Sequence, residues 1–291
     1  MKRFFDTVND DWWSPIADQL ASPWFTGDHM VRVLRASANF VCKVEADGLT
    51  YYLRFSHSSE RDPVKIDAEI KYILHLIGKG VKANKPVQSL SGNYVESIPT
   101  GLGVFHTVLF EAVPGEHLES ADLDIQGFHR WGEVLGDLHE ASAGYLSDVI
   151  PSWRAHVAYV RIIVPDSEHV VLNELALVES ALNEFHIDES SYGVIHYDFE
   201  MDNICWKDGV PGFMDFDDCF YQWYAADIVY ALRDLFNDKI DKINIQDERF
   251  QSFLKGYKSI RPISDEGLRN IPLQFRLQQP SLICKNPLVN K

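Results

Sequence analysis

The chain has 291 residues, of which 46% are apolar and 24% charged, which is typical of a soluble globular protein with one large domain or two modest lobes. Its 43 acidic and 27 basic residues give a formal net charge of −16, which disfavours binding to nucleic acids and to anionic membranes. No apolar run approaches the length of a membrane-spanning helix. The start, MKRFFDTVNDDWW, lacks an apolar core and a small-residue cleavage site, so we expect no secretory signal.

The cysteines point to a reducing environment. They lie far apart and match no metal-binding or redox spacing. The four are Cys42, Cys205, Cys219 and Cys284. Reduced thiols are the simplest interpretation, and they favour a cytoplasmic location.

The first third of the sequence is rich in strand-forming residues. The pair Asp47-Gly48 is typical of a hairpin turn, and residues 37–39, Ser-Ala-Asn, separate an earlier pair of β-rich runs. We therefore predict an antiparallel sheet that includes strands at residues 31–36, 40–46 and 50–55.

A helix is predicted after the third strand. Asp62 and Pro63 form a typical helix start, with Asp as the N-cap and Pro at the first helical position, and Gly78 ends the pattern. The apolar residues at helical spacing are Ile66, Ile70, Ile73, Leu74 and Ile77. Strand-like pieces follow Pro86 and close with the apolar run 104–110.

The second half of the sequence is mostly helical in pattern. Apolar residues recur at helical spacing in two separate stripes, which predict two amphipathic helices. The stripes are Phe128, Trp131, Leu135 and Leu138, and Val171, Leu175, Val178 and Leu182. Residues 272–291 lack this periodicity, so we expect a short or disordered tail, with a truncated C-terminal lobe as the alternative.

Residues with chemical potential are concentrated in the segment 194–219, VIHYDFEMDNICWKDGVPGFMDFDDC. Asp198 follows a short apolar pair, and Asn203 follows Asp198 after five residues. Two short strands, joined by a turn at residues 207–209, lead from Asn203 to Asp215. Because a hairpin brings its two ends together, these three polar side chains are expected to converge.

Phosphoryl transfer from a nucleoside triphosphate requires such a set of side chains. One carboxylate accepts the proton of the attacking hydroxyl, while an amide and a second carboxylate hold Mg²⁺ against the phosphates. We therefore predict that Asp198 is the catalytic base and that Asn203 and Asp215 are metal ligands. The alternative is a surface hairpin whose Asp and Asn residues only cap turns.

The pattern His-x-Asp-x-x-x-x-Asn at residues 196–203, followed by Asp215-Phe216, resembles the catalytic and metal-binding loops of kinases. It is most similar to the aminoglycoside phosphotransferase and choline kinase-like superfamily, over roughly residues 28–260. The Asp-Phe-Asp-Asp run at 215–218 and the Asp-Ile-Val at 227–229 resemble its homoserine kinase and stress response kinase branch.

This resemblance implies an α+β, protein kinase-like fold with two lobes. Residues 1–110 are expected to form an N-terminal nucleotide-binding lobe, with an antiparallel sheet and one helix. Residues 111–116 are the expected hinge, and residues 117–291 the mainly helical C-terminal lobe. The implied function is transfer of the γ-phosphoryl group of ATP or GTP, with Mg²⁺, to a hydroxyl of a small molecule.

The resemblance also implies residues that contact the phosphates. Ser37 and Asn39 fall where the family has a loop over the phosphates, although glycines are lacking there. Arg54 replaces the Lys that the family often has on a strand, and an Arg can hold phosphate bidentately. Lys43 is the alternative cation, and Glu69 is expected to pair with the strand cation. Each of these residues alone is also consistent with an ordinary turn, strand or helix surface.

The interlobe connection and the acceptor side complete the expectations. Glu111 to Val113 resembles the hinge whose backbone binds adenine. Tyr197 replaces a Gly common in the family, and Glu200 and Asp202 replace neutral residues. With Asp217 and Asp218 nearby in sequence, these carboxylates predict a negative acceptor side and an amine-bearing acceptor such as an aminoglycoside or amino alcohol.

Two other functions use the same features. A protein Ser/Thr kinase has the same chemistry, but no long segment for peptide docking lies between Asp215 and Asp227. A pseudokinase that serves as a binding module is the second, and Arg54 and the glycine-poor loop favour it.

Overall fold

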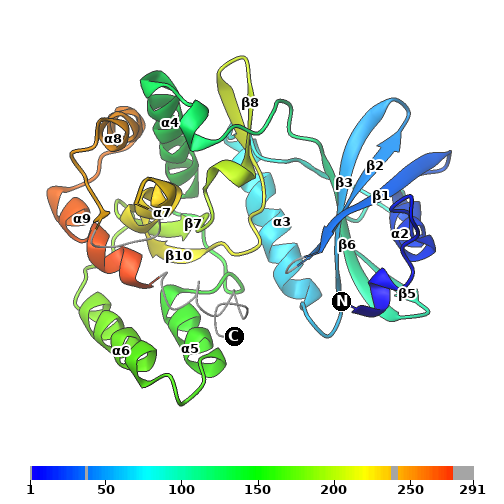
Figure 1. The fold of residues 1–291 in the computed structure, drawn as a ribbon, viewed down its shortest axis with the longest axis horizontal. Helices are drawn as coiled ribbons and strands as arrows, with labels where there is room; N and C mark the ends of the chain where they lie inside the picture. Colours follow the sequence, from blue (N-terminus) through cyan, green and yellow to red (C-terminus); the bar gives the residue numbers. More distant parts are fainter. Residues whose placement is uncertain (1, 37–38, 237–241, 278–291) are drawn as a thin grey trace. The chain divides into compact units, whose positions relative to one another are not determined.

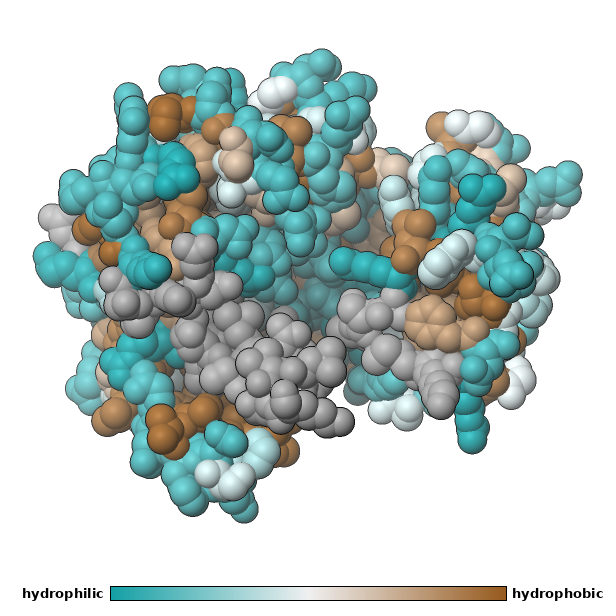
Figure 2. Space-filling model, viewed as in Figure 1, coloured by the Kyte–Doolittle hydropathy of each residue, from teal (hydrophilic) through white to brown (hydrophobic). Residues whose placement is uncertain are grey.

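A computed structural model describes residues 2–36, 39–236 and 242–277 of the chain (Figure 1). The chain divides into two compact units, Met1–Pro114 and Gly115–Lys291. Within the described ranges, no helix has both the length and the apolar character needed to span a bilayer. Most of the face visible in Figure 2 is hydrophilic, as expected from the charged composition.

The first unit is built on a six-stranded sheet in the order β1-β2-β3-β6-β4, with β5 also paired to β6 (Figure 1). Within the described residues, the strand pairings of this sheet are antiparallel, as predicted. The strands are β1 (His29–Ala36), β2 (Phe40–Ala46), β3 (Leu49–His57), β4 (Pro86–Val87), β5 (Glu96–Thr100) and β6 (Gly103–Glu111). Asp47 and Gly48 join β2 to β3 with φ values of 51° and 76°, the backbone that a tight hairpin turn requires.

The helix predicted after β3 is present as α3 (Pro63–Gly78). The Asp62 side chain accepts a hydrogen bond from the Val64 backbone N–H, as a helix N-cap does. The structure adds two short helices before the sheet, α1 (Lys2–Phe5) and α2 (Pro15–Ala21), and a 3₁₀ turn, η1 (Ser22–Trp24). Their sequences are too short to show a helical period.

The two faces of this sheet have different partners. Alternate residues of β2 are buried, and one face carries an aromatic cluster in which Phe40 stacks on Phe55 at 5.1 Å between ring centroids. Phe4 of α1 packs against both rings. Arg54 lies on the other face, where its side chain reaches Glu69 of α3. The alternation of β3 thus places a cation between the sheet and the helix.

The second unit combines helices with two small sheets. The helices are α4 (Ile125–Ser142), α5 (Trp153–Ile163), α6 (His169–Asn183), α7 (Tyr224–Ala231), α8 (Glu248–Ile260) and α9 (Asp265–Arg269). Helices α4 and α8 approach closely at two glycines. A Cβ on Gly132 would lie 1.9 Å from the Phe253 carbonyl oxygen, and one on Gly256 would lie 1.9 Å from that of His129. Only glycine permits this spacing.

Both apolar stripes predicted for this unit face its interior. All four residues of the first stripe are buried in α4, and Leu175, Val178 and Leu182 are buried in α6. The expectation of a non-helical tail from residue 272 is wrong for residues 272–277, which belong to a helical turn at 271–277. Ile271, Phe275 and Leu277 are buried there, so tertiary packing stabilises a helix that its periodicity does not predict. The remainder of the tail lies outside the described residues.

Two antiparallel strand pairs carry the loops of the candidate site. Strand β7 (Tyr192–Ile195) pairs with β10 (Phe220–Trp223), and β8 (Ile204–Lys207) pairs with β9 (Val210–Phe213). The β8–β9 hairpin confirms the prediction from residues 204–214. The segment between β7 and β8 ends in a 3₁₀ turn, η3 (Met201–Asn203).

Candidate active site

The loop after β7 holds Asp198 beside Asn203. The side-chain Nδ2 of Asn203 donates a hydrogen bond of 2.9 Å to the backbone carbonyl of Asp198. Asn203 is buried, with 8% of its surface exposed, whereas the Asp198 side chain is 23% exposed. The amide therefore fixes the loop backbone, and the carboxylate remains accessible to a substrate.

The β8–β9 hairpin brings the residue before Asp215 to the same loop. The Met214 backbone N–H donates to the Asn203 carbonyl at 3.0 Å. The Met214 carbonyl in turn accepts a hydrogen bond of 3.0 Å from Nε2 of His196. These two bonds tie both ends of the hairpin together, so Asp198, Asn203 and Asp215 are carried by one hydrogen-bonded assembly. His196 is fully buried and links the end of the hairpin to the start of this loop.

Two residues of the site have a left-handed backbone that favours glycine. Tyr197 has a φ of 76° and Asp215 a φ of 70°. Such a conformation costs a residue with a Cβ about 1 to 2 kcal/mol, and strain of this kind is concentrated at functional sites. The ring of Tyr197 is buried and packs on Phe220 and Tyr230 at centroid distances of 5.2 and 5.3 Å. Aromatic packing therefore offsets the cost of a non-glycine residue before Asp198.

Asp227 of α7 anchors the backbone of the loop that carries Asp198. Its carboxylate is fully buried and accepts hydrogen bonds of 2.8 Å from the backbone N–H groups of both His196 and Tyr197. A third bond, of 3.0 Å, comes from Nε2 of His139 in α4. Three donors compensate the buried charge, so the strained loop is held in place by a residue 30 positions later in the chain.

His139 extends this anchor to α8. Its Nδ1 lies 3.0 Å from the Tyr257 hydroxyl, and its Nε2 faces Asp227. The network assigns a neutral imidazole that accepts from the tyrosine and donates to the carboxylate. Burial lowers the pKa of His139, while the hydrogen bond to Asp227 opposes that effect. Burial also lowers the pKa of His196.

These two histidines make the stability of the second unit depend on pH. The unfolded chain binds protons at both of them below about pH 6.5, whereas the folded chain does not, so stability is lost as the pH falls. We expect the contribution of these two histidines to the free energy of unfolding to drop by roughly 2 kcal/mol between about pH 7.5 and about pH 5.5. It is measured by urea denaturation as the difference between the wild type and variants that lack them, because Glu200, with its raised pKa, acts in the opposite direction in both.

Replacing His196 by Gln keeps a donor near the Met214 carbonyl but removes the titrating group. His196→Gln is expected to show about half of the pH dependence that these two histidines give the wild type. His169→Gln, at an exposed position, is the matched control and leaves the dependence unchanged. Identical pH dependence in the wild type and His196→Gln would contradict the prediction.

The carboxylates near Asp198 differ in their surroundings. Glu200 forms an ion pair with Arg233, and its side chain is 18% exposed. Burial raises the pKa of Glu200 to about 7, although the Arg233 guanidinium acts in the opposite direction. Asp202 is exposed. Glu200 is thus paired within the protein, whereas the Asp202 side chain is open to solvent.

The cation and the acid predicted in the first unit form a pair. Arg54 donates from both terminal nitrogens to the two oxygens of Glu69, each at 2.7 Å. Both side chains are largely buried, at 11% and 5% exposure. The alternative cation, Lys43, is more exposed and pairs with Glu45 on its own strand. Glu69 is therefore not part of an exposed helix surface. Its carboxylate can be buried because the charge of Arg54 compensates it.

The remaining predicted nucleotide contacts also lie in the first unit. Asn39 is buried at the start of β2, and Ser37 lies outside the described residues. The Glu111 side chain pairs with Lys85 at 2.8 Å. Within the described ranges, the backbone N–H and C=O of Val113 have no hydrogen-bond partner. They are therefore able to bind a ligand.

Sequence reasoning did not assign roles to His139, Asp227 or Arg233. Asp227 has one local signal, since it is a single acidic residue in the otherwise apolar helix YAADIVYA. A lone charge on an apolar helix needs a buried partner. The partner cannot be identified locally, because His139 is 88 positions away.

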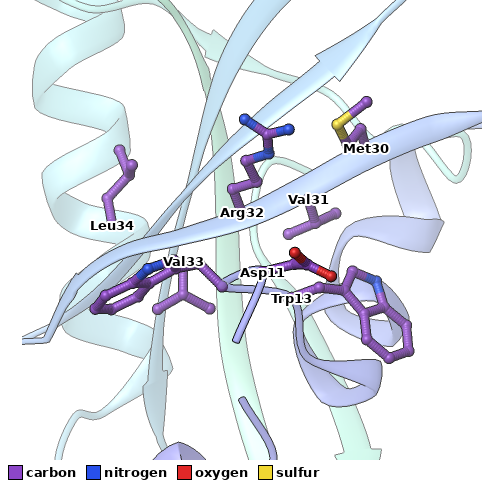
Figure 3. Close-up of a pocket in the computed structure, with 8 residues that line it drawn as sticks. Asp11, Trp13, Met30, Val31, Arg32, Val33 and Leu34 are labelled. Carbon is purple, nitrogen blue, oxygen red and sulfur yellow. The ribbon is translucent and has the colours of Figure 1, made fainter. Parts of the chain in front are cut away.

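A cavity of about 620 Å³ lies elsewhere, in the first unit. Figure 3 shows that its lining comes from β1 and from the segment that precedes α2. It includes Asp11, Trp13, Met30 and Arg32, and none of the predicted site residues. Its residues form no set of convergent catalytic groups, so this cavity is not the candidate active site.

The donor set at residues 203 and 215 suits a hard divalent cation. No group of three or more His, Cys, Asp or Glu side chains in the described ranges forms a metal site of its own. A kinase site needs only one amide and one carboxylate, because the phosphates supply further oxygens. Since Nδ2 of Asn203 is used by the Asp198 carbonyl, the amide oxygen is the atom left for a cation.

Comparison with known proteins gives a family. A model of the phosphotransferase enzyme family matches residues 31–263. Amicoumacin kinase of Bacillus subtilis (strain 168) is 27% identical over 275 residues, which are 90% of this chain and 81% of the relative.

Solved structures show the same fold. Amicoumacin kinase hAmiN, in complex with AMP-PNP, Ca²⁺ and Ami, aligns with a TM-score of 0.84 and 25% identity, over 98% of this chain and 88% of that one. The microcompartment-associated aminopropanol kinase has a TM-score of 0.71 and 22% identity, over 93% and 88% of the two chains. Spectinomycin phosphotransferase APH(9)-Ia has a TM-score of 0.61 and 13% identity, over 95% and 90%. The predicted α+β, protein kinase-like fold is confirmed.

Proposed function

Because this chain belongs to the phosphotransferase enzyme family and is an ATP-dependent small-molecule kinase, we propose that it transfers the γ-phosphoryl group of Mg²⁺-bound ATP to a hydroxyl of an amine-bearing small molecule. The observation that supports this most is the assembly of Asp198, Asn203 and the residue before Asp215 through side-chain and backbone hydrogen bonds. One rigid support for these side chains is what a base and two hard oxygen ligands acting together need.

Each side chain of this assembly has one role in the proposal. The Asp198 carboxylate accepts the proton of the acceptor hydroxyl. The hydroxyl oxygen at the same time bonds to the γ-phosphorus, and ADP leaves. The Asn203 amide oxygen and the Asp215 carboxylate hold Mg²⁺, which neutralises phosphate charge when bound. Asp227 and His196 keep the loop and the hairpin end in register.

The first unit binds the nucleotide in this proposal. Arg54, oriented by Glu69, contacts the phosphates, and Ser37 and Asn39 cover them. The backbone of Glu111 and Val113 binds adenine, within a hinge at residues 111–116 that follows the nucleotide-binding lobe, 1–110, and precedes the catalytic lobe, 117–291. The open backbone groups of Val113 support this assignment. AMP-PNP and Ca²⁺ in the hAmiN complex support a nucleotide and a divalent cation.

The proposed location is the cytoplasm, where ATP is available. Cys42, Cys205 and Cys219 are buried thiols in this structure. Burial raises the pKa of the Cys42 thiol to about 12 and also raises that of Cys205. Buried protonated thiols are unreactive, which suits a chain that keeps its cysteines reduced.

Charge supports an acceptor with an amine. Asp202 is exposed in the catalytic loop, and Asp217 and Asp218 are half-buried just after Asp215. These carboxylates lie in a chain of net charge −16, so a cationic acceptor is attracted and an anionic one is repelled. Similarity to amicoumacin kinase over 90% of the chain supports a small-molecule acceptor.

A matched set of acceptors tests the proposal. 1-Amino-2-propanol, propane-1,2-diol and lactate differ mainly in the charge beside one hydroxyl, and amicoumacin is included because relatives phosphorylate it. We expect phosphorylation of an amine-bearing acceptor, with its KM rising several-fold between about 50 and about 300 mM salt. Asp202→Asn is expected to raise that KM further and to leave the KM for ATP unchanged.

Glu248→Gln is the control, because Glu248 is exposed in the first turn of α8 and removal of its charge should not change the acceptor KM. Efficient turnover of the diol or of lactate, indifferent to salt and to Asp202→Asn, would rule out the amine specificity. No phosphorylated product and no ADP from any acceptor would rule out the proposed function.

The metal assignment has its own test. Asp215→Asn is preferable to Asp215→Ala, because Asn tolerates the φ of 70° at this position. We expect the Mg²⁺ concentration for half-maximal nucleotide binding, measured by calorimetry, to rise about tenfold or more when a charged ligand is lost. Asn203→Ala is expected to have a smaller effect in the same direction. Unchanged Mg²⁺ dependence in both variants would contradict the metal site.

A further inference from the structure

One arginine lies between two carboxylates of the catalytic loop. Arg233 begins the 3₁₀ turn η4 (Arg233–Phe236), directly after α7. Its NH1 lies 3.5 Å from Oδ1 of Asp198, and its NH2 contacts Oε2 of Glu200. The guanidinium is largely buried, with 14% of the side chain exposed. A planar guanidinium can contact two carboxylates at once, which a lysine ammonium does less well.

The two contacts are unequal, and the difference suits catalysis. The contact with Glu200 is close, whereas 3.5 Å to Asp198 is too long for a strong hydrogen bond. A tight pair with Asp198 would reduce its ability to accept a proton, while a looser one orients the carboxylate and compensates its charge. Glu200 therefore acts as the anchor that keeps the guanidinium beside Asp198.

Removing the cation would leave like charges close together. Asp198, Glu200 and Asp202 lie within five residues of one loop, and Asp234 follows the arginine. The acidic groups Asp198, Asp202 and Asp234 all act electrostatically on Glu200, and Arg233 is the cation that opposes them. At a pH high enough to keep Glu200 ionised, the uncompensated Asp198 and Glu200 side chains would repel each other and move apart.

The same segment of chain also holds the loop backbone. Asp227 in α7 binds the N–H groups of His196 and Tyr197, and Arg233, just beyond the end of α7, contacts side chains of the following residues. Backbone and side-chain positions of the loop are thus set by one continuous segment, 224–233. A change at Arg233 should alter the Asp198 side chain without moving the backbone that Asp227 holds.

We propose that Arg233 is a positioning residue for phosphoryl transfer, which, anchored by Glu200, orients the Asp198 carboxylate toward the acceptor hydroxyl. The inference rests on the proposed role of Asp198 as the base. In this proposal the Arg233–Glu200 pair affects the phosphoryl-transfer step. It does not contribute to binding of the nucleotide or of the acceptor amine.

The test compares Arg233→Met, which keeps length and removes charge, with Arg233→Lys, Glu200→Gln and the double variant Arg233→Met/Glu200→Gln. ADP release from Mg²⁺-ATP is measured with 1-amino-2-propanol, with amicoumacin, and with water as acceptor. We expect Arg233→Met to lower kcat about 10- to 100-fold, as displacement of a catalytic group by about 1 Å does, with the KM for ATP unchanged. Arg233→Lys restores most of kcat.

The double variant makes the test specific. In assays at a pH that keeps Glu200 ionised, Glu200→Gln removes the repelling charge, so it is expected to raise kcat in the Arg233→Met background, although it lowers kcat a few-fold in the wild type. A merely structural role would not give this change of sign. Arg249→Met removes a partly exposed arginine paired with Asp247 in the same unit and is the control, with wild-type kcat.

Each outcome decides the inference. Wild-type kcat in Arg233→Met, or a raised KM for ATP with kcat unchanged, overturns the positioning role. The positioning role is also overturned if the effects of Arg233→Met and Glu200→Gln on kcat are additive in the double variant and Arg233→Lys does not restore kcat. If Arg233→Met fails to fold by circular dichroism, Arg233→Lys and the double variant carry the comparison. Absence of ADP release by the wild type under all three conditions overturns the proposed function itself.

Discussion

Asp198→Asn is expected to lower kcat about 10²- to 10⁴-fold, because the amide cannot accept the proton of the attacking hydroxyl. The backbone carbonyl of Asp198, which accepts the Asn203 hydrogen bond, is unchanged by the substitution. The proposed metal ligands therefore keep their positions, and the Kd for Mg²⁺-ATP, measured by calorimetry, should stay within about twofold of the wild type.

Asp208→Asn is the matched control. Asp208 is exposed at the turn of the β8–β9 hairpin, with a φ of 53° that Asn tolerates. It loses the same charge from the same unit, in the hairpin that follows the Asp198 loop, and is expected to keep wild-type kcat. Near-normal kcat in Asp198→Asn would show that Asp198 is not the base, and an equal loss in both variants would indicate a general effect of charge.

Asp227→Ala is expected to have the largest effect on stability. The variant leaves two backbone N–H groups and the His139 ring without their acceptor in a fully buried place. Removing one partner of such a buried polar network costs about 3 to 5 kcal/mol. Guanidinium denaturation should show this loss. The residual folded enzyme should also have a lower kcat, because the strained backbone at Tyr197 is free to relax.

A second acidic residue of the same unit provides the comparison. Asp247 caps α8 and accepts from the Arg249 backbone N–H, so Asp247→Ala is expected to cost only about 1 kcal/mol and to leave kcat unchanged. If Asp227→Ala destabilises no more than Asp247→Ala, the buried anchor is not important for stability. If it destabilises strongly but the remaining folded protein has wild-type kcat, Asp227 does not position the catalytic loop.

Local pattern was sufficient for much of the fold. The turn at Asp47-Gly48, the cap at Asp62 and the stripe from Phe128 to Leu138 are all determined by residues a few positions apart, and all three are present as predicted. The hairpin between Asn203 and Asp215 is similarly local, so its convergence could be predicted from the chain alone. Residues 271–277 could not be, because their helix is stabilised by burial and not by periodicity.

The sequence by itself therefore determined the fold class, the family resemblance and the three polar residues of the candidate site, since their spacing encodes the hairpin that joins them. Only the tertiary structure decided which other residues fix the positions of these three side chains and compensate their charges. Asp227 and His139 reach the loop across 30 and 88 positions, and Arg233 pairs with Glu200 across 33. Such contacts depend on how α4, α7 and the loop pack, because compensation of a buried charge is a property of three-dimensional neighbours and leaves no periodic signal.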